Sequence, residues 1–228
     1  MKRLSRMAVR ETAETGGDIT ECDLSALDLS DIDLSGMSLK GSDLTGGKVS
    51  KANLSGADLS GARLDGADIS SSNLTGADLR GASLDRADLS FSTLIAVDCT
   101  GAKLRGANMK LSNLSAANFT GADLKGADLQ QAEAGGALFN DAIMDGTNAY
   151  GTSFVSASLA GASLRDAELT KSDLNAADLR GTNLAGATIL NANLKAALLE
   201  GADLTGARLT GSDVRRTALD QVRRGGKK

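Results

Sequence analysis

Residues 52–66 read ANLSGADLSGARLDG, in which a five-residue unit occurs three times in succession. The unit has a small residue two positions before a leucine, a polar residue between the two, and a glycine two positions after the leucine. The same register extends outward to Ile19 on one side and to Leu219 on the other, without insertion or deletion. A fixed repeat over nearly the whole chain is typical of a solenoid, in which each unit packs on its neighbours.

A period of five residues differs from the 3.6-residue period of a helix and from the two-residue alternation of a long strand. Short extended segments that end in a turn fit the period better. On an extended segment the small residue and the leucine point to one side, and the polar residue between them points to the other. Glycine favours a tight turn because it adopts positive φ at little cost. The pattern therefore predicts an all-β solenoid with an interior of leucine and alanine.

The unit resembles the A(D/N)LXX motif of the pentapeptide repeat family, and the resemblance covers residues 17–220. It implies a right-handed quadrilateral β-helix with four pentads per coil, hence about ten coils and a rod roughly 50 Å long. We expect residues 1–16 to form an N-terminal cap, which could be helical, and residues 221–228 to form a flexible basic tail. Residues 20 positions apart should stack, so that Phe119 lies on Phe139.

The residue types argue against several kinds of active site. The chain has no His, and therefore no Ser-His or Cys-His nucleophile pair. Cys22 and Cys99 are too few for a disulfide scaffold or a Cys₄ zinc site, and at inward positions they should be buried and reduced. Glycine motifs that bind phosphates or dinucleotides are missing. We therefore expect no enzyme activity, no metal and no cofactor.

Membrane and secretion signals are also missing from the sequence. No stretch of about 18 apolar residues occurs. Residues 1–17 are basic but lack the apolar segment of a secretory signal. We predict a cytoplasmic protein that does not bind membranes.

The net charge of −4 is unevenly distributed. Residues 17–214 contain 15 basic and 26 acidic residues, a net charge of −11, whereas both ends are basic. Stacking of residues 20 positions apart aligns three acidic groups: Asp58, Asp78 and Asp98; Asp65 and Asp85; and Asp68 and Asp88. These carboxylates either bond to nearby backbone groups as the outward residues of the motif, or form faces that imitate nucleic acid. The acidic body itself is not expected to bind nucleic acid, since phosphates need a basic surface.

A few apolar residues fall at outward positions. Phe91 and Leu111 should stack in adjacent coils, with Ile95 near them, and these three residues form a candidate contact surface for a protein. Single surface hydrophobes are ordinary, so the alternative is that they have no role. Residues 131–155 are the most degenerate part of the repeat, which indicates a locally repacked coil, a kink or a partner site.

The C-terminal end of the solenoid is a candidate for self-association. A terminal coil leaves a strand edge open. Val214, Ala218 and Leu219 lie at the last turn, and two rods could meet there about a twofold axis.

Two functions fit these observations. The first is a non-catalytic, rigid protein-interaction scaffold with a partner of unknown identity. The alternative, which the family resemblance implies, is a DNA-mimicking binder or inhibitor of DNA gyrase or another type II topoisomerase, of the quinolone-resistance type.

Overall fold

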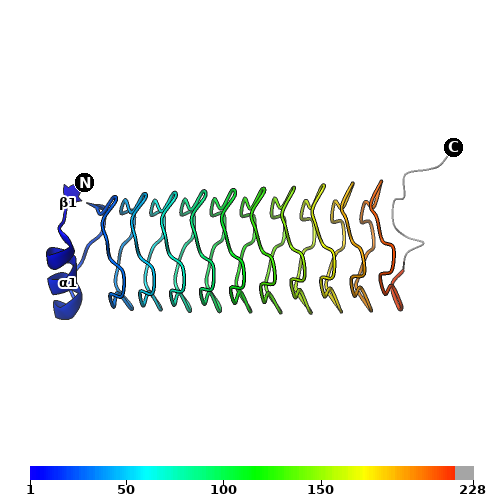
Figure 1. Cartoon of the computed structure of the whole chain (residues 1–228), viewed down its shortest axis with the longest axis horizontal. Helices are drawn as coiled ribbons and strands as arrows, with labels where there is room; N and C mark the ends of the chain where they lie inside the picture. Colours follow the sequence, from blue (N-terminus) through cyan, green and yellow to red (C-terminus); the bar gives the residue numbers. More distant parts are fainter. Residues whose placement is uncertain (219–228) are drawn as a thin grey trace.

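The computed structural model describes residues 1–218, which form a rod with α1 at one end (Figure 1). Three elements begin the chain: β1 (Lys2–Arg3), α1 (Arg6–Thr15) and β2 (Cys22–Asp23). β1 pairs in parallel with β2. From Asp23 to Asp213, single-residue parallel bridges join each polar position of the motif to the position 20 residues later. The chain is therefore a β-helix with 20 residues per coil, and one turn in every pentad makes it four-sided.

Backbone hydrogen bonds join each coil to both of its neighbours. The N–H of Asp58 donates to the carbonyl of Met37 in the preceding coil at 2.9 Å. The next N–H, that of Leu59, donates to the carbonyl of Asp78 in the following coil at 2.8 Å. The extended segments are too short to be assigned as strands, yet their backbone groups are paired as they would be in a parallel sheet.

The glycine of the motif lies in the turn at positive φ. Across Gly56, which has a φ of 65°, the N–H of Ala57 donates to the carbonyl of Leu54 at 3.1 Å. This is a β-turn with positive φ at its third residue, where glycine is favoured because it lacks a Cβ. The turn that the motif predicts is therefore present.

The interior consists of stacked leucine side chains with alanine beside them. Every leucine-position residue from Leu54 to Leu129 is buried, as the register predicts. Phe119 and Phe139 stack with their ring centroids 5.0 Å apart and their planes at 3°, which confirms the predicted stacking. Phe154 meets Phe139 edge-on, with centroids 5.7 Å apart. Cys22 and Cys99 are buried and unpaired, as predicted.

The degenerate segment 131–155 keeps the register of the β-helix. Its bridges continue through Glu133 and Ile143 without interruption. Ala134 and Ala149, which replace leucine, are fully buried. The segment is thus a repacked coil of the same geometry.

α1 lies against the N-terminal end of the β-helix (Figure 1). The helix begins after Ser5, whose Oγ accepts a hydrogen bond from the N–H of Ala8, and it buries Val9 completely. The guanidinium of Arg6 donates to the carbonyls of Asp28 at 2.9 Å and Ser30 at 2.8 Å. In later coils the equivalent carbonyls accept N–H groups of the preceding coil. Arg6 therefore supplies donors that a preceding coil would otherwise supply. Within residues 1–218, no helix is both long and apolar enough to cross a membrane.

Candidate interaction surface

The acidic residues that the sequence analysis selected lie in columns along the rod. Bridges join Asp58 to Asp78 and Asp78 to Asp98, and another bridge joins Asp68 to Asp88. On a further face, the N–H of Asp85 donates to Oδ1 of Asp65 at 3.0 Å. The structure therefore brings each of the three groups together, with successive carboxylates in adjacent coils.

Several of these carboxylates hold the turn that follows them. The N–H of Ser60 donates to Oδ1 of Asp58 at 2.9 Å, and the N–H of Thr100 donates to Oδ1 of Asp98 at 2.9 Å. This contact, two residues along the chain, needs one side-chain oxygen, which Asp and Asn both provide. It accounts for the preference of the motif for these two residues without invoking a ligand.

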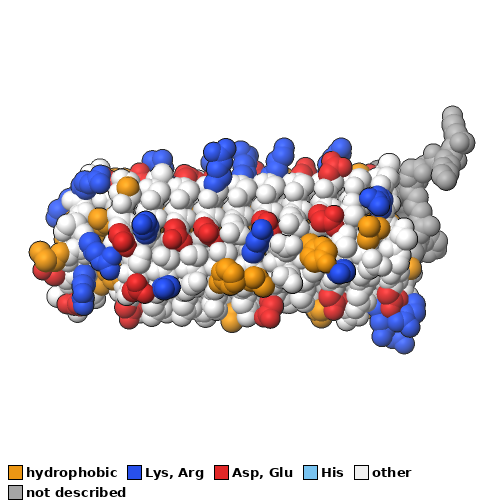
Figure 2. Space-filling model, in the orientation of Figure 1, with side chains coloured by type: hydrophobic (Ala, Val, Ile, Leu, Met, Phe, Trp, Pro, Cys, Tyr) orange, Lys and Arg blue, Asp and Glu red, His pale blue; other side chains and the backbone are white. Residues whose placement is uncertain are grey.

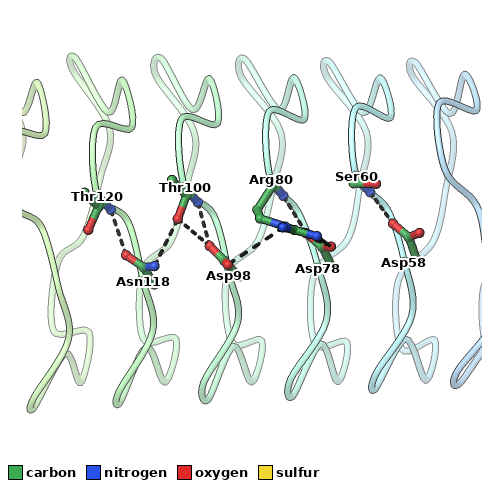
Figure 3. A network of polar contacts seen from close by, with 8 residues as sticks. All are labelled: Asp58, Ser60, Asp78, Arg80, Asp98, Thr100, Asn118 and Thr120. Atoms are coloured by element: carbon green, nitrogen blue, oxygen red, sulfur yellow. Dashed lines mark hydrogen bonds and ion pairs between the residues drawn. The ribbon is translucent and has the colours of Figure 1, made fainter.

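Arg80 contacts two of the three carboxylates in the column formed by Asp58, Asp78 and Asp98 (Figure 3). Its Nη2 lies 2.5 Å from Oδ2 of Asp78, and its Nε lies 4.0 Å from Oδ2 of Asp98. The hydrogen bond from Arg80 lowers the pKa of Asp78 and raises the pKa of Arg80 itself. The column is therefore a ladder of mixed charge rather than a continuous acidic strip.

The stability of the protein should fall at acid pH. The pKa of Asp23 is lowered mainly by the hydrogen bonds that its carboxylate accepts from the Oγ and N–H of Ser25, and that of Asp213 falls to about 2 beside Arg215. A carboxyl whose pKa is lower in the folded state stabilises the fold above its unfolded pKa of about 3.9, and this contribution disappears as the pH falls toward the folded value. We expect the unfolding temperature to be flat above about pH 5 and to drop between about pH 4 and pH 2. Calorimetry across this range checks it; an unfolding temperature that stays constant down to pH 2 would contradict the assigned contacts.

Phe91 and Leu111 are exposed apolar residues, with 62% and 48% of their surface accessible. They occupy the same turn position in adjacent coils, as predicted from the sequence. Ile95 belongs to the turn that follows the next extended segment and is partly buried. The structure thus places Phe91 and Leu111 at one edge of a face and Ile95 at the opposite edge of that face.

Three exposed apolar residues of the β-helix were not predicted from the sequence. Leu138, Ile143 and Leu198 are 40%, 42% and 42% accessible. Each occupies the polar position of the motif, so a search of that position for apolar residues would have found them. Leu138 and Ile143 lie on adjacent faces of one coil, on either side of Asp141. Figure 2 shows hydrophobic side chains in small, separate groups among charged ones on the face in view.

One face of the β-helix carries no charge over four coils, and we call it the uncharged face. Its outward residues are Asn53, Ser55, Asn73, Thr75, Thr93, Ile95, Asn113 and Ser115. The bridged polar column of this face ends at Asp33 on one side and at Glu133 on the other. Phe91 and Leu111 lie at the corner that leads into it.

The repeats match a family model described as pentapeptide repeats. The model matches in eight copies, which together span residues 18–223. This chain belongs to the pentapeptide repeat family. Solved structures of pentapeptide repeat proteins that resemble it are right-handed β-helices, as the sequence analysis expected.

Two of these structures resemble the chain over most of its length. HetL, a pentapeptide repeat protein involved in heterocyst differentiation regulation from the cyanobacterium Nostoc, is 26% identical, with a TM-score of 0.67 and 96% of each chain covered. A trypsin-treated form of QnrB1, a plasmid-mediated fluoroquinolone resistance protein, is 20% identical, with a TM-score of 0.52; 81% of this chain and 92% of that chain are covered. At 20% identity, QnrB1 shows the fold alone. No curated protein sequence matches the chain.

One corner of this pentapeptide repeat protein departs from the glycine-rich turn more than the other three. At the corner that leads into the uncharged face, six successive coils have a residue other than glycine at positive φ: Asp31, Lys51, Ser71, Phe91, Leu111 and Gln131. An L-residue in this left-handed conformation costs about 1–2 kcal/mol, and bulky residues rarely adopt it. Phe91, at a φ of 59°, and Leu111, at 56°, therefore keep exposed apolar side chains where glycine would avoid strain.

The strain at this corner can be tested by substitution. We expect Phe91→Gly to leave the free energy of unfolding unchanged or to raise it by up to about 1 kcal/mol, because strain is relieved and little buried contact is lost. The converse control is Gly76→Ala, at a φ of 64° with no atom within 4 Å of the added Cβ, which should cost about 1 kcal/mol. Urea unfolding measures both. A clear loss of stability in Phe91→Gly would show that the side chain supports the fold instead.

Proposed function

We propose that this pentapeptide repeat protein is a non-catalytic, rigid scaffold that binds a protein partner. The observation that carries the proposal is the uninterrupted series of bridges from Asp23 to Asp213, which holds the faces of the rod in place through backbone hydrogen bonds. A surface that is already ordered loses little conformational freedom on binding. The similarity to HetL over 96% of both chains supports it, since HetL is described as a participant in regulation.

The chemistry of the described residues is in keeping with binding. Within residues 1–218, no cluster of three or more His, Cys, Asp or Glu side chains is placed to hold a metal ion. Two hollows of about 420 and 390 Å³ lie beside α1, at the end of the rod. Burial raises the pKa of the Cys99 thiol, which makes this residue a poor nucleophile.

A cytoplasmic location stays a prediction from the sequence.

The scaffold proposal can be tested with a photo-crosslinking amino acid placed on each corner of the rod in turn. Arg86, Phe91, Ala96 and Asp141 are exposed turn residues at positive φ, one on each of the four corners. Each is replaced by p-benzoylphenylalanine in the full-length chain, which is irradiated in cells of the source organism. We expect a discrete protein to be crosslinked from at least one corner. The absence of crosslinks from all four corners would refute the scaffold.

A second candidate is the DNA-mimicking topoisomerase inhibitor, and alignment of the acidic residues favours it. Asp58, Asp78 and Asp98 repeat one coil apart, or about 4.8 Å, in a body of net charge −11. Arg80 lies within this column, so we rank this function below the scaffold. Gyrase supercoiling in the presence of the purified protein tests it. Inhibition that is lost on neutralising the acidic columns would support mimicry, and no effect at micromolar protein would end this candidate.

We also propose that the C-terminal end mediates dimerisation. Val214 and Ala218 are partly buried, and Leu219 lies outside the described residues. Arg215 pairs with Asp213 of its own chain at 2.5 Å, which reduces repulsion between the arginines of two facing ends. Light scattering at tens of micromolar protein should show a dimer that Leu219→Glu converts to a monomer. A monomeric intact protein, or a dimer unaffected by the substitution, would rule out this interface.

A further inference from the structure

We propose that the uncharged face, together with Phe91 and Leu111, is the docking surface for a protein whose contacting surface has an apolar centre surrounded by Lys and Arg. This inference rests on the proposed scaffold function and deepens it, because it names the face and the chemistry of the partner.

The composition of the uncharged face differs from that of the body around it. From Asn53 to Ser115 its outward positions hold only amides, hydroxyls and Ile95, within a body of net charge −11. The cores of protein interfaces are depleted of charged residues and enriched in aromatic ones. Phe91 supplies an accessible aromatic ring at the edge of this face, and Leu111 extends the apolar edge by one coil.

The polar groups of the uncharged face are fixed by contacts within the rod. Oδ1 of Asn53 accepts a hydrogen bond from Oγ of Ser55 at 2.8 Å, and Oδ1 of Asn73 accepts one from Oγ1 of Thr75 at 2.7 Å. Side chains that already have partners need not be reordered on binding. The face is therefore prepared to cover a partner without a large loss of side-chain freedom.

The uncharged face is small, so a partner must also cover the residues that surround it, which we call the rim. Four coils about 4.8 Å apart extend over roughly 14 Å, and each side is only a few residues wide. A stable interface buries about 800 Å² on each partner, which is larger than the uncharged face alone. The partner must therefore reach around both corners and over both ends of this face.

The rim that a partner would cover is mainly acidic. Asp33 and Glu133 lie at the two ends of the uncharged face. Asp68 and Asp88 lie on the neighbouring face, before the corner of Phe91. Asp58 and Asp98 lie beyond the opposite corner. Basic partner residues would complement these carboxylates, and such complementarity sets which partner binds and how fast it associates.

Lysine and arginine residues near the rim are fewer than the carboxylates, and two of them already form ion pairs within the rod. Nζ of Lys110 lies 3.0 Å from Asp128, and Arg80 is bound to Asp78. Lys48 and Lys51 lie toward one end only. The surplus of carboxylates disfavours a second copy of this chain as the occupant, because two such rims would place like charges opposite each other.

The four-corner crosslinking experiment separates this inference from the proposed function. We expect the photo-crosslinker at position 91 to capture a protein and the one at position 141, on the diagonally opposite corner, to capture none. The crosslinked peptide of the partner should contain Lys or Arg beside apolar residues. Capture from position 141 alone would overturn the docking face while leaving the scaffold function in place. A crosslink from position 91 to a second copy of this chain would also overturn the inference.

Binding of the purified, crosslinked protein to the intact chain then measures the contribution of the apolar edge. The double variant Phe91→Gly and Leu111→Gly introduces at this corner the glycine that most other turns have, and we expect it to fold while binding at least about tenfold more weakly. The matched control is Leu138→Asn with Ile143→Asn, which removes the apolar pair on either side of Asp141 and should bind as the intact chain does. Affinity should also fall with added salt, as expected for a basic partner on an acidic rim. Unchanged binding by the double glycine variant, or affinity independent of salt, would refute the proposed surface.

Discussion

Leu74→Lys should abolish stable folding of the middle of the rod. Leu74 has no accessible surface, and its column neighbours, one coil away on each side, are Leu54 and Leu94, which are equally buried. Among residues 1–218 no buried carboxylate is present for such a lysine to pair with. It must either bury its charge or lose its proton, and lowering its pKa from about 10.4 to below 7 costs about 5 kcal/mol. That is comparable to the whole stability of many domains. Urea unfolding followed by circular dichroism should show the loss of a folded baseline, or a decrease of more than about 4 kcal/mol.

Asn73→Lys is the matched control for this substitution. Asn73 is the adjacent residue, it points outward, and lysine or arginine already occupies the equivalent position at Lys48, Arg63 and Lys103. The substitution removes the hydrogen bonds that the N–H and Oγ1 of Thr75 donate to Oδ1 of Asn73, so a loss of about 1 kcal/mol is expected. Equal losses for Leu74→Lys and Asn73→Lys would show that the inward and outward assignment is wrong.

Phe139→Ala should destabilise the protein by about 3–5 kcal/mol. Phe139 is fully buried between two other rings, stacked on Phe119 at 5.0 Å and in edge contact with Phe154 at 5.7 Å. The substitution loses the stabilisation that comes from burying the ring, leaves a cavity in the core and removes both aromatic contacts. Backbone hydrogen bonds fix the spacing between coils, so the walls of the cavity have little room to collapse. Thermal and urea unfolding measure the loss.

Phe91→Ala is the control for Phe139→Ala, since the same side chain is removed from an exposed turn. Its effect should stay within about 0.5 kcal/mol. A small effect at Phe139 would mean that the neighbouring rings close the gap. A large effect at Phe91 would mean that its side chain packs on the rod rather than facing solvent.

Most features of the fold could be predicted from the repeat unit. Because inward residues lie two positions apart, Ala57 and Leu59 could be placed in the core and Asp58 on the surface from spacing alone. The family resemblance implies coils of 20 residues, and with that coil length the contact of Phe119 with Phe139 followed from their positions in the chain. The contact of Phe154 with Phe139 did not follow, since these residues lie on different faces and meet across the core.

The candidate surface depended more on the tertiary structure. The aspartate columns were visible in the sequence, but the ion pair of Arg80 with Asp78 was not, because a long flexible side chain selects its partner in three dimensions. The same holds for Arg6, which reaches carbonyls of Asp28 and Ser30 more than 20 residues away.

The sequence by itself determined the period, the inward and outward positions and the absence of histidine chemistry, since each depends on local spacing or residue type. Only the tertiary structure decided how far each outward residue is exposed and which side chains it contacts. It showed that the uncharged face has strained, exposed Phe91 and Leu111 at one edge and partly buried Ile95 at the other. The physical reason is that surface chemistry arises from residues 5, 15 and 20 positions apart, which become neighbours only when the chain closes each coil.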